Sequence, residues 1–225
     1  MSYGNVFIFD ISDVKQNDYE YIKSFLDYRT IERLRRYKRF KDKVKSSVGE
    51  YIARKACAKY VCKDIKELQI SFNEYGKPYF RNADNFKFNI SHSGRYVVCA
   101  VSEKEIGIDI QKHIDLDEGC SRLFLSKSEV EERNHLDEDS KKDYEITAWV
   151  YKESYSKFKG KGLYIPYTEI TLVKDNGVII DDRGLDRCVF YEKRFKQGYT
   201  MVVTCHENIE LNYVRLNKDF IIKEI

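Results

Sequence analysis

The sequence predicts an α+β protein made of two pseudo-symmetric halves, each with helices packed on an antiparallel sheet. In both halves, segments with helical periodicity precede short segments typical of strands. Residues 94–100 also resemble residues 198–205 in their order of glycine, apolar strand and polar end. A chain of 225 residues is long enough for two small domains, each with its own core.

Residues 6–9 form a short apolar run that Asp10 and Ser12 help to end, which predicts a strand. Small and apolar side chains spaced by three and four predict two or three helices within residues 18–63. Alternation then predicts strands at 68–72, 86–91, 96–102 and 106–110, with a turn at 74–78 and a hairpin connection at 103–105.

In the second half, Ser126 or Ser128 could cap a helix that runs to Arg133, with Glu129 in its first turn. Residues 144–159 carry the strongest helical pattern, and strands are expected at 169–173, 189–195 and 199–205. We therefore expect an N-terminal half at 1–104 and a C-terminal half at 105–225, whose last strand and tail could pack back on the N-terminal half.

Composition bounds the class of protein. The hydrophobic fraction of 42% argues against disorder, and the longest apolar run, 96–101, is far too short to span a bilayer. The first residues lack the pattern of a secretory signal. Six cysteines occur without a CxxC motif, and Cys99 and Cys205 lie in apolar runs typical of buried positions. These features predict a reduced, cytoplasmic protein.

Two short motifs carry the chemistry. In the strand Gly107-Ile108-Asp109-Ile110, the side chains of Gly107, Asp109 and Gln111 share one face, and Gly107 would leave room beside the carboxylate. In the helix from Trp149 to Lys157, Glu153 and Lys157 are spaced by four and share a stripe. Two carboxylates suit one Mg²⁺ ion that handles a pyrophosphate. The alternative is an ordinary exposed ion pair and an aspartate that merely ends a strand.

Two further segments could bind an anion. Residues 29–45 contain nine basic residues against Glu32 and Asp42, which indicates either a solvated helix face or a surface for a polyanion. His92 lies between two serines and before Gly94, on an expected turn where hydroxyls, backbone N–H groups and imidazole can converge on an anion.

Five motifs occur in a specific order: Gly76-Lys77-Pro78, the segment FNISHSG at 88–94, GIDI at 107–110, the run from Trp149 to Leu163, and TMVVTC at 200–205. In this order and spacing, over nearly the whole length, the chain resembles the 4′-phosphopantetheinyl transferases. The likeness is closest to the larger, two-halved type that serves non-ribosomal peptide and polyketide synthases. It implies the fold of that family, with the active site at the interface of the two halves.

The resemblance implies transfer of the phosphopantetheine arm of coenzyme A to a serine of an apo carrier protein, with release of 3′,5′-ADP. Asp109 and Glu153 match metal ligands for Mg²⁺, for which Mn²⁺ could substitute, and Glu153 also matches the proposed general base. Lys157 matches a phosphate contact that relays the proton. Further contacts with coenzyme A are implied for Lys152, Ser91, His92, Lys77, Lys45 and Arg33.

Gln111 departs from the family pattern, since many relatives have a glutamate there as a third metal ligand. Its amide oxygen or a water could take that place, and weaker Mg²⁺ binding is expected. Leu123 and Phe124 could dock the carrier protein or belong to the core. We expect a monomer without nucleic-acid or membrane partners. The competing readings are a nucleic-acid-binding module, a catalytically silent relative, and another Mg²⁺-dependent phosphotransferase, for which a glycine-rich phosphate loop is missing.

Overall fold

A computed structural model of the protein describes residues 3–113, 119–173, 178–181, 184–195 and 198–221. The chain divides into two compact units. The first comprises Met1–Asn73, Pro78–Lys104 and Ile209–Ile225, and the second comprises Glu74–Lys77 and Glu105–Asn208. The units differ from the expected halves, 1–104 and 105–225, at two places. Residues 74–77 belong to the second unit, and the C-terminal segment from Ile209 belongs to the first.

The helical segment predicted near the N-terminus forms three helices in the first unit, α1 (Gln16–Lys23), α2 (Tyr28–Arg35) and α3 (Phe40–Val61). Helix α2 begins where the side chain of Asp27 accepts a hydrogen bond from the backbone N–H of Thr30 at 2.8 Å. Helix α3 packs against strands β4 and β5 of the sheet, which places the apolar core of this unit between helices and sheet.

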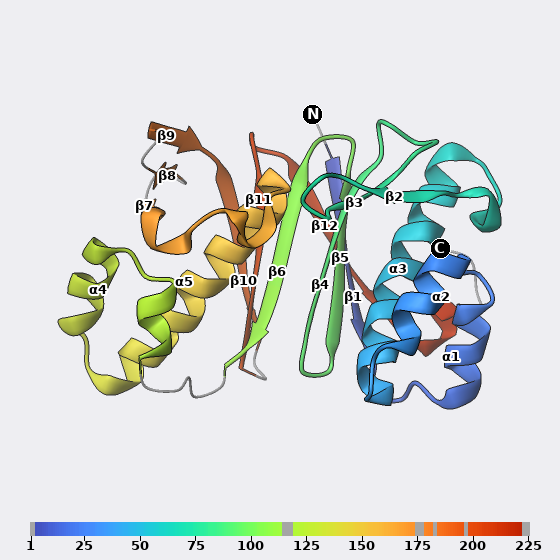
Figure 1. Cartoon of the computed structure of the whole chain (residues 1–225), viewed down its shortest axis with the longest axis horizontal. Coiled ribbons are helices and arrows are strands. Elements are labelled where there is room, and N and C mark those ends of the chain that lie inside the picture. The colour runs from blue at the N-terminus through green and yellow to red at the C-terminus, as the bar shows by residue number, and fades with distance from the viewer. Residues whose placement is uncertain (1–2, 114–118, 174–177, 182–183, 196–197, 222–225) are drawn as a thin grey trace. The chain divides into compact units, whose positions relative to one another are not determined.

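The sheet of the first unit has the strand order β12-β1-β5-β4 (Figure 1). Its strands are β1 (Tyr3–Asp10), β4 (Lys87–Ser93), β5 (Tyr96–Ser102) and β12 (Glu210–Leu216). Neighbours are antiparallel except β1 and β12, which run parallel with Tyr3 opposite Glu210. A separate two-stranded ribbon joins β2 (Ile70–Phe72) to β3 (Pro78–Phe80).

Two local predictions in this region are wrong. Residues 103–105 do not close a hairpin, because β5 pairs with β1 and β4 while β6 (Ile106–Lys112) pairs with β11 (Tyr199–Cys205) in another sheet. His92 does not lie on a turn, because β4 continues to Ser93, which pairs with Tyr96. The turn is made by the two residues between them, where Gly94 adopts a positive φ of 53°.

The second unit contains helices α4 (Lys127–Asn134) and α5 (Glu138–Lys159) and a sheet with the order β10-β11-β6, in which β10 is Val189–Phe195. A smaller sheet joins β7 (Thr171–Val173), β8 (Val178–Asp181) and β9 (Gly184–Arg187). Of the two predicted caps of α4, Ser126 is the one used, and it forms a capping box with Glu129. Helix α5 begins six residues earlier than predicted, because Asp137 accepts a hydrogen bond from the N–H of Ser140 and caps an additional polar turn.

The two units follow the same plan. Each has a 22-residue helix, α3 or α5, that packs against the fully buried central strand of a sheet, β5 or β11 (Figure 1). Cys99 and Cys205 lie in these central strands and are buried, as predicted. Within the described residues, no helix has the length and apolar character needed to cross a membrane.

Candidate functional site

Asp109, Glu153 and Lys157 meet within the second unit. Asp109 lies on β6 with only 1% of its surface exposed, and Glu153 and Lys157 lie one turn apart on α5. The Lys157 ammonium donates to Asp109 Oδ1 at 2.6 Å and lies 3.9 Å from Glu153 Oε2, so these two oxygens are at most about 6.5 Å apart. The expectation that the strand and the helix bring both carboxylates together is therefore met by this geometry.

Gly107 makes this approach of strand and helix possible. A Cβ atom at Gly107 would lie 2.1 Å from the Ser154 carbonyl oxygen and 2.5 Å from the Phe158 backbone nitrogen, both on α5. The expected room beside the carboxylate is thus filled by helix backbone, which corrects the role predicted for Gly107. Only glycine lets α5 lie this close to β6.

Gln111 lies two residues beyond Asp109 on β6, and its amide Nε2 donates to Asp109 Oδ2 at 3.2 Å. The amide therefore orients the carboxylate in this arrangement. Among the described residues, no group of three or more His, Cys, Asp or Glu side chains could hold a metal ion. A metal here would be held by Asp109 and Glu153, with the Gln111 oxygen or water.

The donor set fits a hard divalent cation. Two carboxylates, Asp109 and Glu153, share one ammonium, that of Lys157, so the cluster keeps a net charge of one negative unit. Carboxylate and amide oxygens are the ligands that Mg²⁺ accepts in proteins, together with water and phosphate oxygens.

Tyr167 is a member of the site that sequence reasoning missed. Its hydroxyl donates to Glu153 Oε1 at 2.8 Å from the short 3₁₀ helix η4 (Tyr167–Glu169). Burial raises the pKa of Glu153, and the charge of Asp109 adds to this, while Lys157 and the Tyr167 hydroxyl oppose it. A raised pKa makes the carboxylate a better proton acceptor. No local pattern marks Tyr167, because only the fold returns this turn to α5.

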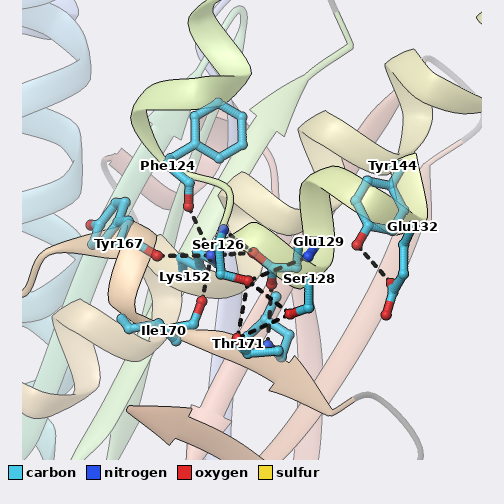
Figure 2. Close-up of polar contacts among 11 residues, drawn as sticks. Phe124, Ser126, Ser128, Glu129, Glu132, Tyr144, Lys152, Tyr167, Ile170 and Thr171 are labelled. Atoms are coloured by element: carbon cyan, nitrogen blue, oxygen red, sulfur yellow. Dashed lines mark hydrogen bonds and ion pairs between the residues drawn. The ribbon is translucent and has the colours of Figure 1, made fainter. Parts of the chain in front are cut away.

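The structure contradicts a phosphate contact for Lys152. Its side chain is 0% exposed, and the ammonium donates to the carbonyl oxygens of Phe124, Tyr167 and Ile170 and to Glu129 Oε2 (Figure 2). Burial lowers the pKa of Lys152, and the charge of Glu129 opposes this. An ammonium has three protons to donate, so these four acceptors leave none for a ligand.

Leu123 and Phe124 have opposite environments. Leu123 is 78% exposed, whereas Phe124 is 4% exposed and packs edge-to-face on Trp149 in the core. Of the two alternatives left open for Phe124, a docking surface or the core, the structure supports the core. A cavity of about 490 Å³ adjoins the site, and its walls include Gln111, Leu123, Phe124, Trp149, Ile165 and Tyr167.

Lys77 also lies in the second unit, near the end of α5. Its ammonium donates to Glu105 Oε2 at 2.6 Å and to the Phe158 carbonyl oxygen at 3.1 Å. A cation at a helix C-terminus is favoured by the helix dipole. The structure therefore gives Lys77 a place in which it stabilises α5, and contact with a ligand remains a prediction.

The remaining predicted residues lie in the first unit. His92 is exposed and Ser91 is buried, because neighbouring side chains of a strand point to opposite faces. Lys45 lies on α3 with Asp42 at 3.4 Å. Arg33 on α2 donates to Glu50 Oε2 at 3.0 Å, and its Nε atom is buried without a hydrogen-bond partner among the described residues. An unused donor suits an anionic ligand.

Comparison with known proteins adds independent findings. A family model described as the N-terminal part of 4′-phosphopantetheinyl transferase matches residues 13–104. A model described as the 4′-phosphopantetheinyl transferase superfamily matches residues 105–203.

Curated relatives match over most of the chain. The 4′-phosphopantetheinyl transferase Sfp of Bacillus subtilis (strain 168) is 32% identical over 193 residues, which cover 84% of this chain and 86% of that protein. The 4′-phosphopantetheinyl transferase gsp of Aneurinibacillus migulanus is 30% identical over 190 residues, which cover 84% and 79%. The rat L-aminoadipate-semialdehyde dehydrogenase-phosphopantetheinyl transferase is 30% identical over 198 residues, which cover 76% and 64%.

Proposed function

The chain belongs to the 4′-phosphopantetheinyl transferase superfamily, and we propose that it transfers phosphopantetheine from coenzyme A to a carrier-protein serine with Mg²⁺ held by Asp109 and Glu153. The observation that carries the site assignment is the Lys157 ammonium shared by both carboxylates. Because both acidic side chains face this one ammonium, they could also face one bound metal ion. The release of 3′,5′-ADP follows from the chemistry of coenzyme A.

Glu153 is proposed as the general base. The serine hydroxyl must lose its proton as its oxygen attacks phosphorus, and a partly buried carboxylate with a raised pKa is suited to accept it. Burial is the main cause of this raised pKa, and the charge of Asp109 adds to it. A bound Mg²⁺ would neutralise negative charge on the pyrophosphate.

Lys157 is proposed to contact the phosphates, because its half-buried ammonium already faces the carboxylates that would hold the metal. Arg33, Lys45, Lys77, Ser91 and His92 are proposed as further contacts with coenzyme A, in line with the family resemblance. Among them, the unused Nε donor of Arg33 is the most direct physical support. A cytoplasmic location and a monomeric state stay predictions.

Leu123 is proposed to contact the carrier protein, since it is an exposed leucine that lines an apolar cavity beside the site. Leu123→Asp is expected to raise the KM for the carrier about tenfold, the loss expected when one leucine no longer becomes buried. The KM for free coenzyme A should not change. A rise in the coenzyme A KM with an unaltered carrier KM would refute this docking role.

Gln111→Glu is expected to lower the Mg²⁺ concentration for half-maximal rate about tenfold, because a charged ligand adds on the order of 1.5 kcal/mol over a neutral one. The measurement is a Mg²⁺ titration of carrier modification at saturating coenzyme A. Lys112→Gln is the matched control, since it makes the same change in net charge at the next residue. An equal shift in both variants, or none in either, would place Gln111 outside the metal site.

One assay tests the proposed function. The protein is incubated with coenzyme A, Mg²⁺ and apo carrier domains of the fatty-acid, polyketide and peptide types, and the carriers are weighed by mass spectrometry. We expect a gain equal to one phosphopantetheine on at least one carrier. No gain on any of them, with coenzyme A binding intact by calorimetry, would instead support a silent relative.

A further inference from the structure

A buried charged pair joins three segments of the second unit: helix α5, residues 124–129 and residues 167–172. Lys152 of α5 and Glu129 of α4 are both almost completely buried and form an ion pair (Figure 2). Lys152 also donates to the carbonyl oxygen of Phe124 at 2.8 Å, of Tyr167 at 2.8 Å and of Ile170 at 2.7 Å. We call Lys152, Glu129 and these three carbonyl groups the Lys152 anchor.

Glu129 extends the anchor to the segments around it. Its Oε2 accepts from the Ser126 N–H at 2.8 Å, which is the start of α4, and its Oε1 accepts from the Leu172 N–H at 3.1 Å, which lies in β7. Every polar atom of the pair is thus used within the protein, and two stretches of the chain, 124–129 and 167–172, are held to α5.

Such an arrangement is not explained by stability alone. Removal of two charges from water costs several kcal/mol per ion, and well-packed apolar side chains are often as stabilising as a buried ion pair. What an apolar pair could not do is hold the carbonyl groups of Tyr167 and Ile170 at fixed positions. The anchor therefore specifies the place of the η4 turn.

The η4 turn carries the hydroxyl that reaches Glu153. Tyr167 is held at two points by successive residues of α5: its carbonyl oxygen by Lys152, and its hydroxyl by Glu153 Oε1 at 2.8 Å. Its ring packs edge-to-face on Trp149, one helical turn earlier, at 5.6 Å between centroids. These three contacts fix the ring and the direction of its O–H group.

We propose that Tyr167 and Lys152 are positioning residues that hold Glu153 in the orientation needed for catalysis. The inference rests on the proposed role of Glu153 as base and metal ligand. With Oε1 bound by the hydroxyl, Oε2 stays 3.9 Å from the Lys157 ammonium, beyond a direct hydrogen bond. Without the hydroxyl, Glu153 can rotate towards Lys157 and shorten this ion pair to a direct hydrogen bond, which withdraws both groups from their substrates.

Tyr167→Phe tests this directly, because it keeps the ring and the carbonyl contact with Lys152 and removes only the O–H group. We expect kcat for carrier modification to fall about tenfold to a hundredfold, the range for loss of a group that orients a ligand. The KM for coenzyme A and the calorimetric Kd for coenzyme A should both stay within about twofold of the wild-type values. A twofold change is no larger than the effect of an ordinary surface substitution.

Tyr151→Phe is the matched control. Tyr151 is also a buried tyrosine whose hydroxyl donates to a carboxylate. Its acceptor is Glu192, at 2.9 Å, and not Glu153. Its kcat should equal that of the wild type. If Tyr167→Phe lowers kcat no more than Tyr151→Phe does, Tyr167 has no positioning role and the proposal is overturned.

Lys152 is tested by replacing both members of the ion pair with uncharged residues. Lys152→Met alone would leave Glu129 buried without its partner and would unfold the protein. The double variant Lys152→Met with Glu129→Gln is expected to bind coenzyme A normally while its kcat falls at least about tenfold. Wild-type kcat in a folded double variant would overturn the role of Lys152. If it does not fold, Tyr167→Phe still decides the proposal.

The proposed function and the positioning role of Tyr167 would fail with different results. If the wild-type protein labels no carrier, the proposed function fails before any variant is compared. If the wild type labels a carrier and Tyr167→Phe is as active, the function stands and only the positioning role is lost.

Discussion

Glu153→Gln is expected to lower kcat for carrier modification by about 10³-fold, within the range for loss of a general base. The amide has nearly the same shape and can still accept the hydrogen bond from the Tyr167 hydroxyl at Oε1. What it loses is the ability to take the serine proton and the charge that would hold Mg²⁺. Binding of coenzyme A, measured by calorimetry without metal, should change little.

Glu145→Gln separates this effect from general damage to α5. Glu145 is a buried carboxylate on the same helix, paired with Arg133 at 2.6 Å, two turns before Glu153. Its replacement should lower the melting temperature and leave kcat near the wild-type value. Equal losses of kcat in both variants would show that Glu153 acts through the fold of the helix and not through chemistry.

Gly107→Ala is expected to destabilise the protein by about 3 kcal/mol, at the upper end for overpacked positions. The added Cβ would meet the Ser154 carbonyl oxygen at 2.1 Å and the Phe158 nitrogen at 2.5 Å, and both are helix backbone that no rotamer change can move. Calorimetry should show a fall in melting temperature of about 6–12 °C for a chain of this size.

The same substitution should also lower activity, because α5 carries Glu153 and Lys157 and must shift away from Asp109. Gly162→Ala is the comparison: Gly162 has a positive φ of 53° and no atom within 4 Å of an added Cβ, so only the backbone conformation is penalised. That cost is about 1–2 kcal/mol. A Gly107→Ala protein as stable as the wild type would mean that strand and helix do not pack this closely.

The pair of carboxylates could be predicted because each lies in a segment with a clear period. Alternation along β6 places Asp109 and Gln111 on one face, and the spacing of four on α5 places Glu153 and Lys157 on one stripe. The capping box of Ser126 and Glu129 is equally local. Local patterns of this kind determine which residues share a face.

The failed and missing predictions concern contacts between distant segments. A lysine beside a catalytic glutamate is expected to face solvent or ligand, yet Lys152 points into the unit, where Glu129 and three carbonyl groups neutralise and solvate it. Tyr167 reaches Glu153 only because the anchor places its turn.

Strand pairing was misjudged for the same reason. The three-residue connection at 103–105 satisfies the length rule for a hairpin, but β6 pairs instead with β11, where Asp109 lies opposite Val202. By contrast, the pairing of β12 with β1 agrees with the expectation that the tail could pack back on the N-terminal half. Such pairings depend on the total burial of each sheet and cannot be derived from the turn alone.

The most direct test of the account is a titration with Mn²⁺ in place of Mg²⁺, in the presence of coenzyme A, followed by electron paramagnetic resonance. The wild-type protein is expected to bind one ion per chain, and Asp109→Asn and Glu153→Gln should each weaken that binding at least about tenfold. Undiminished binding of one ion in both single variants would contradict the claim that these two carboxylates share a cation.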